Sequence, residues 1–451
     1  MTADRPHDAD TLDLLEGLVR RARAGGADAA DAVAVDSVSL TAASRFGALE
    51  RVNRAEAGTL GLRVFVGRRQ AVVSSADRSP RALDELVERA VAMARAVPED
   101  PFCGLADPGS VVRAWPDLDL CDPDEPDAGA LAEQARAMEE GALAVPGVVN
   151  SRTVEARWSR SAAAIVASNG FAGSYARSQR SLLALVLAGD GTTMERDAEH
   201  DTTVYGADLR SPAEVGRKAG ERAARRLTSR KVDSRKVPVV FEPRMASSLL
   251  DHLVAAVSGP AVARGTSFLK DRMGQAIFPD TVTIVDDPTV RRGLRSRPFD
   301  AEGAAVAPRA IVEDGRLASW LLDLRSARQL GLTTTGHAAR GASSPPAPAP
   351  SNIYLAAGRR SRDSLLGEIK DGLYVTEMMG MGVNGVTGDY SRGASGFWIE
   401  DGQLAYPVSE LTVAGNLKEM FLNLEAADDL ERRTGMDAPT VRIDGMTVAG
   451  L

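Results

Sequence analysis

IVEDGRL at residues 311–317, IEDGQL at 399–404 and VRIDGM at 441–446 are the stretches that decide the fold of the C-terminal half. Each places an Asp-Gly pair between apolar, strand-like residues. Asp and Gly tolerate the positive φ angles that a two-residue type I′ hairpin turn requires. Three such hairpins predict that residues 237–451 form a largely antiparallel, β-rich domain with a barrel-like or sandwich-like architecture.

The N-terminal half mixes helical and strand-like patterns, so an α+β fold is expected for the whole chain. Apolar residues recur at helical spacing over 11–24 and after Ser79-Pro80, where proline favours the first helical turn. Asn169-Gly170 lies between two apolar runs and predicts another hairpin. Further helices are expected at 129–144 and, basic and exposed, at 212–226, with strands at 33–40, 60–66, 70–75, 148–158, 161–168 and 182–187.

A proline-rich, acidic stretch marks a domain boundary. Six prolines between Pro98 and Pro126 cannot be accommodated in a helix or a central strand. The chain is therefore divided into an N-terminal α+β module (1–97), a linker (98–128), a middle α+β segment (129–230) and a C-terminal β-rich domain (237–451). The expected fold class is an N-terminal α/β half followed by an antiparallel, barrel-like C-terminal half.

The composition narrows the class of protein. The 451 residues include 62 acidic and 54 basic side chains, for a net charge of −8, without a dense basic run that would bind nucleic acid. No apolar stretch approaches the roughly 18 residues that cross a membrane, and the polar N-terminus lacks a secretory signal. We therefore expect a cytoplasmic protein that binds neither nucleic acid nor a membrane, with Cys103 and Cys121 as reduced thiols.

Three short motifs suggest chemistry but lack the companions that it needs. GMGVNG at 380–385 matches a dinucleotide fingerprint, yet the glycine-rich residues that follow cannot begin the required helix, so we expect a loop. Ser267 and Lys270 fit a Ser-x-x-Lys motif, whose companion motifs are absent. The third motif is a run of potential metal ligands that is expected to lie in a solvated loop: Asp197, Glu199, His200 and Asp201.

The helix expected at 244–257 carries a carboxylate and an imidazole side by side. Adjacent helical positions point about 100° apart, so Asp251 and His252 do not converge on one metal ion. A self-contained zinc motif with two histidines four residues apart is excluded by the positions of the four histidines: His7, His200, His252 and His337.

From this helix onward the sequence resembles the TldD/PmbA family, in its PmbA (TldE) branch. The resemblance covers residues 240–425 closely, with a looser match before them. The stretches that carry it are 248–259 (SLLDHLVAAVSG), 265–271 (GTSFLKD), 297–303 (RPFDAEG), 326–337, 375–382 (VTEMMGMG), 387–400 (TGDYSRGASGFWIE) and 406–418 (YPVSELTVAGNLK). Together these stretches are far more specific than any single motif above.

The resemblance implies a two-subunit cytosolic metallopeptidase that cleaves unfolded or extended peptides and matures some peptide antibiotics. Its TldD branch carries His-Glu-x-x-x-His on the helix that corresponds to 244–257, and a later cysteine ligand. Here Asp251 and His252 stand about where the first histidine and the glutamate would be, no second histidine follows, and no cysteine occurs after Cys121. Since a zinc site needs at least three protein ligands, the resemblance implies no catalytic, cofactor-binding or metal residues in this chain, and zinc in the partner subunit.

The chain thus resembles the non-catalytic partner of a TldD-like metallopeptidase subunit, in a hetero-oligomer that encloses the zinc and receives an extended peptide. A homodimer is the alternative assembly. The candidate peptide-facing or partner-facing residues lie in a glycine-rich loop expected at 380–396: Gly380, Gly382, Asn384, Asp389, Ser391 and Arg392. Two other classes stay open, namely an autonomous hydrolase that uses Ser267 and Lys270 or the 197–201 cluster, and a peptide-binding module without catalysis.

Overall fold

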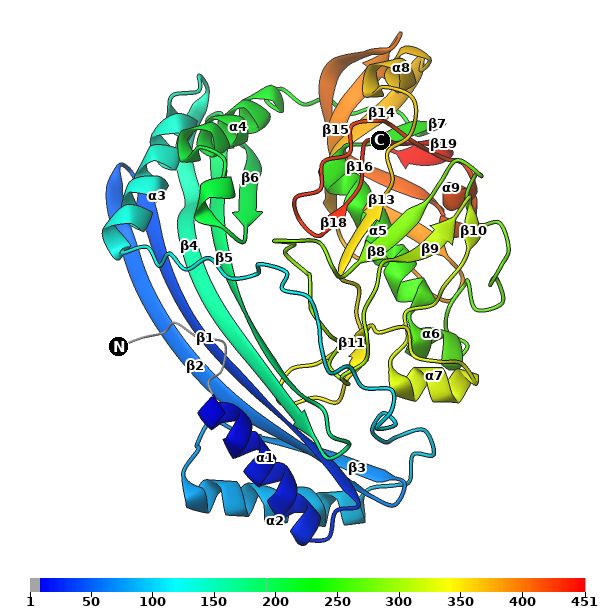
Figure 1. Ribbon diagram of the computed structural model, residues 1–451. Coiled ribbons are helices and arrows are strands. Elements are labelled where there is room, and N and C mark those ends of the chain that lie inside the picture. Colours follow the sequence, from blue (N-terminus) through cyan, green and yellow to red (C-terminus); the bar gives the residue numbers. More distant parts are fainter. Residues whose placement is uncertain (1–8, 192, 451) are drawn as a thin grey trace.

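The N-terminal half is built on one six-stranded antiparallel sheet. The structure is a computed structural model that describes residues 9–191 and 193–450 (Figure 1). The sheet has the order β3-β2-β1-β4-β5-β6. Its strands are β1 (Ala29–Arg45), β2 (Ala48–Val66), β3 (Arg69–Ser75), β4 (Val148–Ala167), β5 (Ala172–Ala188) and β6 (Glu195–Thr203). Because β1 pairs with both β2 and β4, segments on either side of the proline-rich stretch share this sheet.

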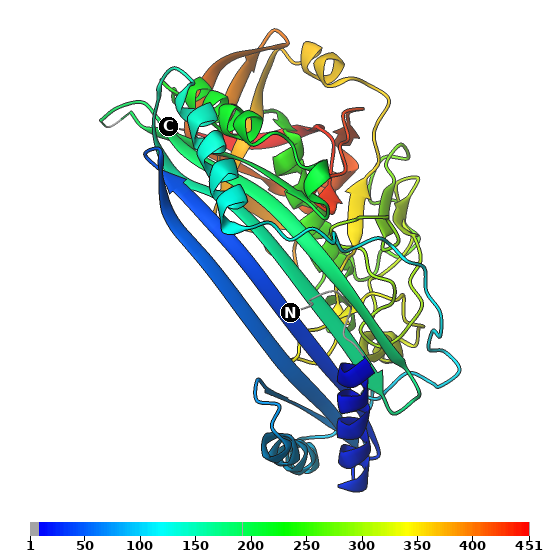
Figure 2. The same ribbon diagram turned by 60° about the vertical axis from the view of Figure 1, so that its left-hand side comes forward.

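Four helices cover one face of this sheet, in two pairs at its two ends (Figures 1 and 2). The pairs are α1 (Ala9–Ala24) with α2 (Pro80–Ala96), and α3 (Ala128–Leu143) with α4 (Pro212–Arg225). Successive strand residues point to opposite faces of a sheet. On β1, Ala32 therefore packs against the first pair and Leu40 against the second, whereas Val33 points to the other face and packs with residues of the C-terminal half.

The C-terminal half contains a closed five-stranded barrel. Its strands pair in the order β16-β15-β14-β7-β19, and β16 also pairs with β19, which closes the ring. Every neighbouring pair is antiparallel except β7 and β14. The strands are β7 (Arg235–Phe241), β14 (Asp371–Met379), β15 (Asp389–Glu400), β16 (Gln403–Asn416) and β19 (Val441–Ala449), with β17 (Leu424–Ala426) beside β19. The predicted α+β fold with a barrel-like C-terminal half is confirmed.

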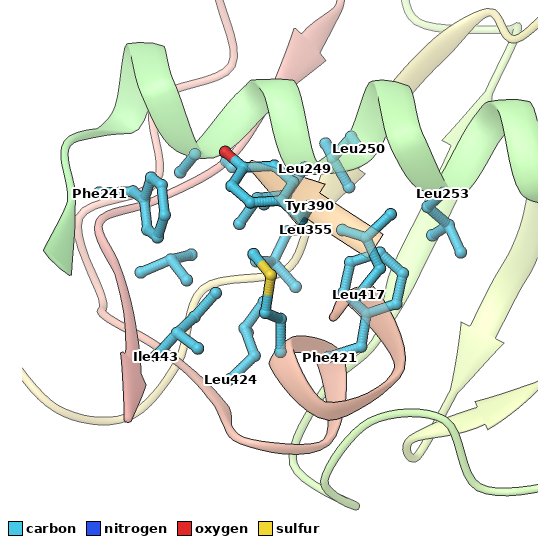
Figure 3. Packing of buried hydrophobic residues seen from close by; sticks show 14 of the residues in the cluster. Phe241, Leu249, Leu250, Leu253, Leu355, Tyr390, Leu417, Phe421, Leu424 and Ile443 are labelled. Carbon is cyan, nitrogen blue, oxygen red and sulfur yellow. The ribbon is translucent and has the colours of Figure 1, made fainter. Parts of the chain in front are cut away.

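A second sheet stands beside the barrel, in the order β10-β9-β8-β13-β18. Its strands are β8 (Ile284–Asp287), β9 (Arg309–Glu313), β10 (Arg316–Leu317), β13 (Asn352–Leu355) and β18 (Met436–Asp437). Helix α5 (Pro243–Val257) contacts both layers, and its Leu249, Leu250 and Leu253 pack into their shared core (Figure 3). The remaining elements are η1 (Gly206–Asp208), α6 (Gly259–Ala263), α7 (Leu324–Leu330), α8 (Arg362–Gly367), α9 (Leu417–Leu422), and the pair β11 (Ala338–Ala339) and β12 (Ala347–Pro348).

Buried ion pairs join the two halves. Asp31 on β1 accepts hydrogen bonds from Arg63 Nε at 2.8 Å and from Arg340 Nη1 at 2.5 Å. All three side chains are almost completely buried. At the other end of the sheet, Arg226 pairs with Glu377 of the barrel strand β14. Since removal of one partner would leave a buried charge uncompensated, these pairs fix the two halves relative to each other.

The hairpin predictions are confirmed for three of the four turns. Asn169-Gly170 joins β4 to β5. In Asp314-Gly315 and Asp401-Gly402 both residues have positive φ angles, as a type I′ turn requires. The prediction at Asp444-Gly445 is wrong, because this pair lies inside β19, where the pairing with β7 shifts register between Ile443 and Met446. Gly445 adopts a φ angle of +78° in a β-bulge at this point, and strand β19 continues beyond it.

Two further expectations need correction. The strands expected at 148–158 and 161–168 are one continuous strand, β4. The helix expected to be exposed, α4, buries one face, because Gly216 lets it approach α3 so closely that a Cβ there would lie 1.7 Å from the Met138 carbonyl oxygen. Within residues 9–191 and 193–450, no helix has both the length and the apolar character needed to cross a membrane.

Candidate functional site

The helix expected at 244–257 is present as α5. Pro243 occupies its first turn, where the missing N–H has no intrahelical partner to lose. The leucine face of the helix is buried in the core, which leaves Asp251 exposed and His252 half-buried. The carboxylate and the imidazole therefore sit in different environments, as their adjacent positions on the helix predict.

A cavity of about 260 Å³ lies beside the C-terminal half of α5. Three other segments contribute to its wall, namely the turn at 266–268, the segment 381–392 and the start of α9. The lining residues are His252, Ala255, Ala256, Thr266, Phe268, Met381, Val383, Gly385, Arg392 and Leu417. The wall is mostly apolar, and Arg392 and His252 are its titratable members.

The environment of His252 is unusual for a half-buried imidazole. Its Nε2 atom is buried and has no hydrogen-bond partner within the described part of the chain. The ring meets Tyr390 edge-on, with 5.7 Å between the ring centroids. Burial, reinforced by the positive charge of Arg392, lowers the pKa of His252 to about 4, so the ring is neutral at pH 7. An unsatisfied buried polar atom costs about 1–3 kcal/mol, so this nitrogen destabilises the folded state.

The loop that joins β14 to β15, residues 380–388, forms one wall of the cavity. It contains no helix, as predicted, but residues 389–396 of the expected loop belong to strand β15, so Asp389, Ser391 and Arg392 are strand residues. A Cβ at Gly382 would lie 2.0 Å from the Ser391 carbonyl oxygen, and the Gly382 carbonyl oxygen accepts the Ser391 N–H at 2.7 Å. Any side chain at this position would push the loop away from β15. On its other side, the loop accepts the Phe268 N–H at the Gly385 carbonyl oxygen, at 2.9 Å.

Side chains fix the tip of the 380–388 loop. Asn384 accepts the backbone N–H of the residue two positions later, at 2.9 Å, which closes a tight turn. Asp389 accepts hydrogen bonds from the Thr387 hydroxyl at 2.6 Å and from Asn416 Nδ2 at 3.0 Å. These bonds hold the pKa of Asp389 below its usual value. The loop is therefore tied to the end of β16, and Asp389 serves its conformation.

The structure brings the two candidate groups of the sequence together at this cavity. Arg392 lines the same cavity as His252, and its Nε donates to the Gly380 carbonyl oxygen at 3.0 Å. Sequence reasoning did not single out Phe268 or Leu417. Both lie in stretches that carry the family resemblance, 265–271 and 406–418, and that resemblance is the signal that could have indicated them.

Ser267 has a structural role. Its hydroxyl donates to the Ala256 carbonyl oxygen at 2.6 Å and accepts the Leu269 N–H at 3.0 Å. The side chain of Ser267 is buried, whereas Lys270 is exposed. The hydroxyl therefore holds a turn next to α5.

The row of potential ligands at 197–201 lies in strand β6, so the expectation of a solvated loop is wrong. Asp197, Glu199 and Asp201 are buried, and arginines outside β6 form ion pairs with them. Their ion-pair partners are Arg226 and Arg244, Arg210 and Arg222, and Arg210 and Arg433, respectively. Across residues 9–191 and 193–450, no group of three His, Cys, Asp or Glu side chains is arranged to hold a metal ion.

Three family models match the chain in succession. They are the PmbA/TldA metallopeptidase domain 1 at residues 30–94, the central domain at 121–227 and the C-terminal domain at 234–450. Over 428 residues the chain is 37% identical to the metalloprotease PmbA of Escherichia coli, which covers 94% of this chain and 93% of that protein. Over 434 residues it is 36% identical to a metalloprotease PmbA homologue of Haemophilus influenzae, with the same coverage of 94% and 93%.

Solved structures share the whole fold. A protein from Bacteroides thetaiotaomicron, described as a candidate modulator of DNA gyrase, superposes with a TM-score of 0.90 at 27% identity, covering 98% of this chain and 100% of that one. TldE from Thermococcus kodakarensis superposes with a TM-score of 0.85 at 20% identity, covering 97% and 100%. The arrangement of sheet, barrel and α5 is therefore common to these proteins.

Proposed function

The chain belongs to the PmbA/TldD metallopeptidase family, and on this premise we propose that it is the non-catalytic, TldE-like subunit of a two-subunit cytoplasmic metallopeptidase. A TldD-like partner supplies the zinc ion and the catalytic residues. The complex cleaves unfolded or extended peptides, including precursors of peptide antibiotics. We assign no catalytic or metal-binding residue to this chain.

The donor set of α5 is the observation that carries the proposal. A catalytic zinc site needs three protein ligands and an open coordination position. Here α5 offers one half-buried imidazole beside Tyr390 and one exposed carboxylate that diverges from it. The positive charge of Arg392 on the same cavity further disfavours a cation. The residues present therefore do not fit a zinc ion at this helix.

Exposed apolar side chains support a role as a subunit. Met381 is 92% exposed and Val386 is 55% exposed, both on the 380–388 loop beside the cavity. A second exposed group lies at the turn between β1 and β2, where Phe46 and Leu49 project from the sheet. Clusters of exposed apolar residues commonly mark protein interaction sites. We assign the 380–388 loop to the surface that meets the partner subunit or its peptide.

The geometry weakens the reading of an autonomous hydrolase. Both hydrogen-bonding directions of the Ser267 hydroxyl serve the backbone, and the carboxylates of β6 are bound by arginines. A peptide-binding module without a role in catalysis would have the same cavity and loop. Only an experiment distinguishes this function from that of a peptidase subunit.

Reconstitution tests the proposal. The chain is purified alone, together with a TldD-like subunit, and compared with that subunit alone, and each sample is assayed for cleavage of an unfolded peptide and for bound zinc. We expect cleavage only by the pair, with zinc carried by the TldD-like subunit and activity lost on chelation. Chelator-sensitive cleavage or stoichiometric zinc in the isolated chain would overturn the proposal. Peptide binding without any effect on the partner's cleavage would instead identify a binding module.

A further inference from the structure

Arg392 is a cation on the wall of a mostly apolar cavity, and no acidic side chain forms an ion pair with it within residues 9–191 and 193–450. Its Nε donates to the Gly380 carbonyl oxygen at 3.0 Å. Its guanidinium also interacts with the Tyr390 hydroxyl through a hydrogen bond and its positive charge. Asp251 on α5 feels the positive charges of Arg392 and Arg295, but within the described residues neither arginine forms an ion pair with it. The charge of Arg392 is therefore available to an anionic group from outside the chain.

The cavity behind this arginine has the size of a side-chain pocket. Its volume of about 260 Å³ lies below the roughly 300–1,000 Å³ of sites that hold drug-sized ligands. Phe268, Leu417 and Ala255 supply apolar walls, and His252 contributes part of its neutral ring. One aliphatic or aromatic side chain suits the size and the apolar wall of this cavity, whereas a charged side chain inside it would be desolvated.

We propose that this cavity binds the C-terminal residue of an extended peptide, with its apolar side chain against Phe268 and Leu417 and its terminal carboxylate on Arg392. This assignment rests on the proposed function, since it gives the peptide a docking position on the non-catalytic subunit. The cavity thereby selects peptides by their last residue, while cleavage takes place on the partner subunit.

The terminal carboxylate is favoured over an acidic side chain by the geometry of an extended chain. Neighbouring side chains of a strand point to opposite faces, so an internal Asp or Glu next to an apolar residue points away from the cavity. A C-terminal residue carries the apolar group and the carboxylate on one Cα atom. An internal residue of a partner subunit is disfavoured for the same reason, because it carries no carboxylate on the Cα atom that bears its apolar side chain.

Fluorescence anisotropy with the full-length chain alone provides the test. The probes are fluorescein-labelled Gly/Ser peptides that end in Leu as the free acid, in Leu as the amide, or in Ser as the free acid. A fourth probe carries Asp two residues before a Leu amide. We expect the Leu acid to bind about tenfold or more tightly than either comparison peptide. The Leu amide lacks the charged carboxylate that pairs with Arg392, and the Ser acid lacks the apolar side chain that fills the cavity.

Two variants and a control separate recognition from structural damage. Arg392→Gln is expected to weaken binding of the Leu acid about tenfold and to leave the weaker binding of the amide unchanged. Ala255→Phe fills the cavity and is expected to abolish binding of both Leu peptides. Arg272→Gln removes an exposed charge that is not part of the cavity wall and is expected to change nothing.

Four outcomes would overturn the assignment. Equal loss for acid and amide in Arg392→Gln would show that Arg392 only holds the loop. Binding of the Asp-containing amide as tight as that of the Leu acid would assign the arginine to side-chain carboxylates. Unchanged binding in Ala255→Phe would place the peptide elsewhere. Absence of peptide binding, with hydrogen-exchange protection of the 380–388 loop only in the presence of a TldD-like subunit, would identify that subunit as the occupant.

This test is independent of reconstitution. Binding is measured without the partner, so a chain that binds the Leu acid but does not support cleavage would refute the proposed function alone. A chain that supports cleavage but shows no preference for the Leu acid would refute only the assignment of the cavity.

Discussion

Glu302 is a buried acid at the contact between the two halves, and Glu302→Gln is expected to stabilise the protein at alkaline pH. Its Oε2 accepts the Leu324 N–H at 2.8 Å, and it lines a cavity of about 250 Å³ together with Arg63 and Asp323. Burial, opposed in part by the charge of Arg63, raises the pKa of Glu302 to about 8. Gln keeps the acceptor for Leu324 and removes the titration.

The sign of the effect follows from the protons bound by each state. An unfolded glutamate titrates at 4.5, so between this pH and about 8 the folded protein holds a proton that the unfolded chain releases. Stability is therefore full below pH 4.5 and is lost progressively as the pH rises through about 8. At about 1.4 kcal/mol per pKa unit, the raised pKa of Glu302 can lower the free energy of unfolding by at most about 5 kcal/mol between acid and alkaline pH. Structural relaxation and coupling to Asp300 and Asp323 reduce this loss, and we expect Glu302→Gln to recover about 2–4 kcal/mol at alkaline pH.

Urea unfolding at pH 5, 7 and 9 measures the effect. Tryptophan fluorescence is a suitable probe because Trp115 packs against Phe299 at the contact between the halves, with 4.6 Å between the ring centroids. Wild type and Glu302→Gln are expected to coincide at pH 5 and to diverge toward pH 9, with the variant more stable. Glu85→Gln, an exposed pair partner of Arg81, is the matched control. Parallel stability curves for wild type and Glu302→Gln would refute the reasoning.

Three other substitutions test the remaining features. Gly382→Val is expected to reduce partner-dependent peptide cleavage about tenfold or more, because its Cβ would lie 2.0 Å from the Ser391 carbonyl oxygen. Unchanged cleavage would contradict this expectation. Gly17→Ala is the control, because a Cβ at Gly17 meets open space. Asp31→Ala leaves its two arginine partners without a counter-ion and is expected to lower the free energy of unfolding by about 3–5 kcal/mol in urea titrations, so an unchanged midpoint would argue against the buried network. His252→Phe removes an unpartnered nitrogen and is expected to raise the free energy of unfolding by about 1 kcal/mol, whereas a loss would indicate a partner for this nitrogen.

Local signals predicted the elements of the fold well. Ser79 caps α2 and Pro80 begins it, as proposed from the sequence. The same Asp-Gly pair was misleading at 444–445, because a bulge inside a strand needs the same positive φ as a hairpin turn. Which of the two forms depends on whether β7, about 200 residues earlier in the chain, is there to pair on both sides of the bulge.

Features that depend on distant partners were not predictable. The acidic row of β6 was expected in a solvated loop because all its arginine partners lie outside the strand, and two of them, Arg244 and Arg433, lie far along the chain. Similarly, the cavity beside α5 is assembled from four segments of the chain. No local sequence pattern indicates that Phe268 and Arg392 line the same cavity. The glycine-rich loop was predicted as a functional surface, whereas its position on the same cavity as α5 became evident only from the folded structure.

The closed barrel has a consequence for how quickly the protein becomes competent to bind. Val239 of β7 pairs with Leu373 on one side and with Ile443 on the other, so ring closure joins residues far apart in sequence. Contacts of this kind form slowly, because a long loop must be closed before any pairing is gained. The cavity wall includes residues next to β14, β15 and β16, so its assembly must await the closing of the ring. During refolding, helical signal is therefore expected to recover before peptide binding does.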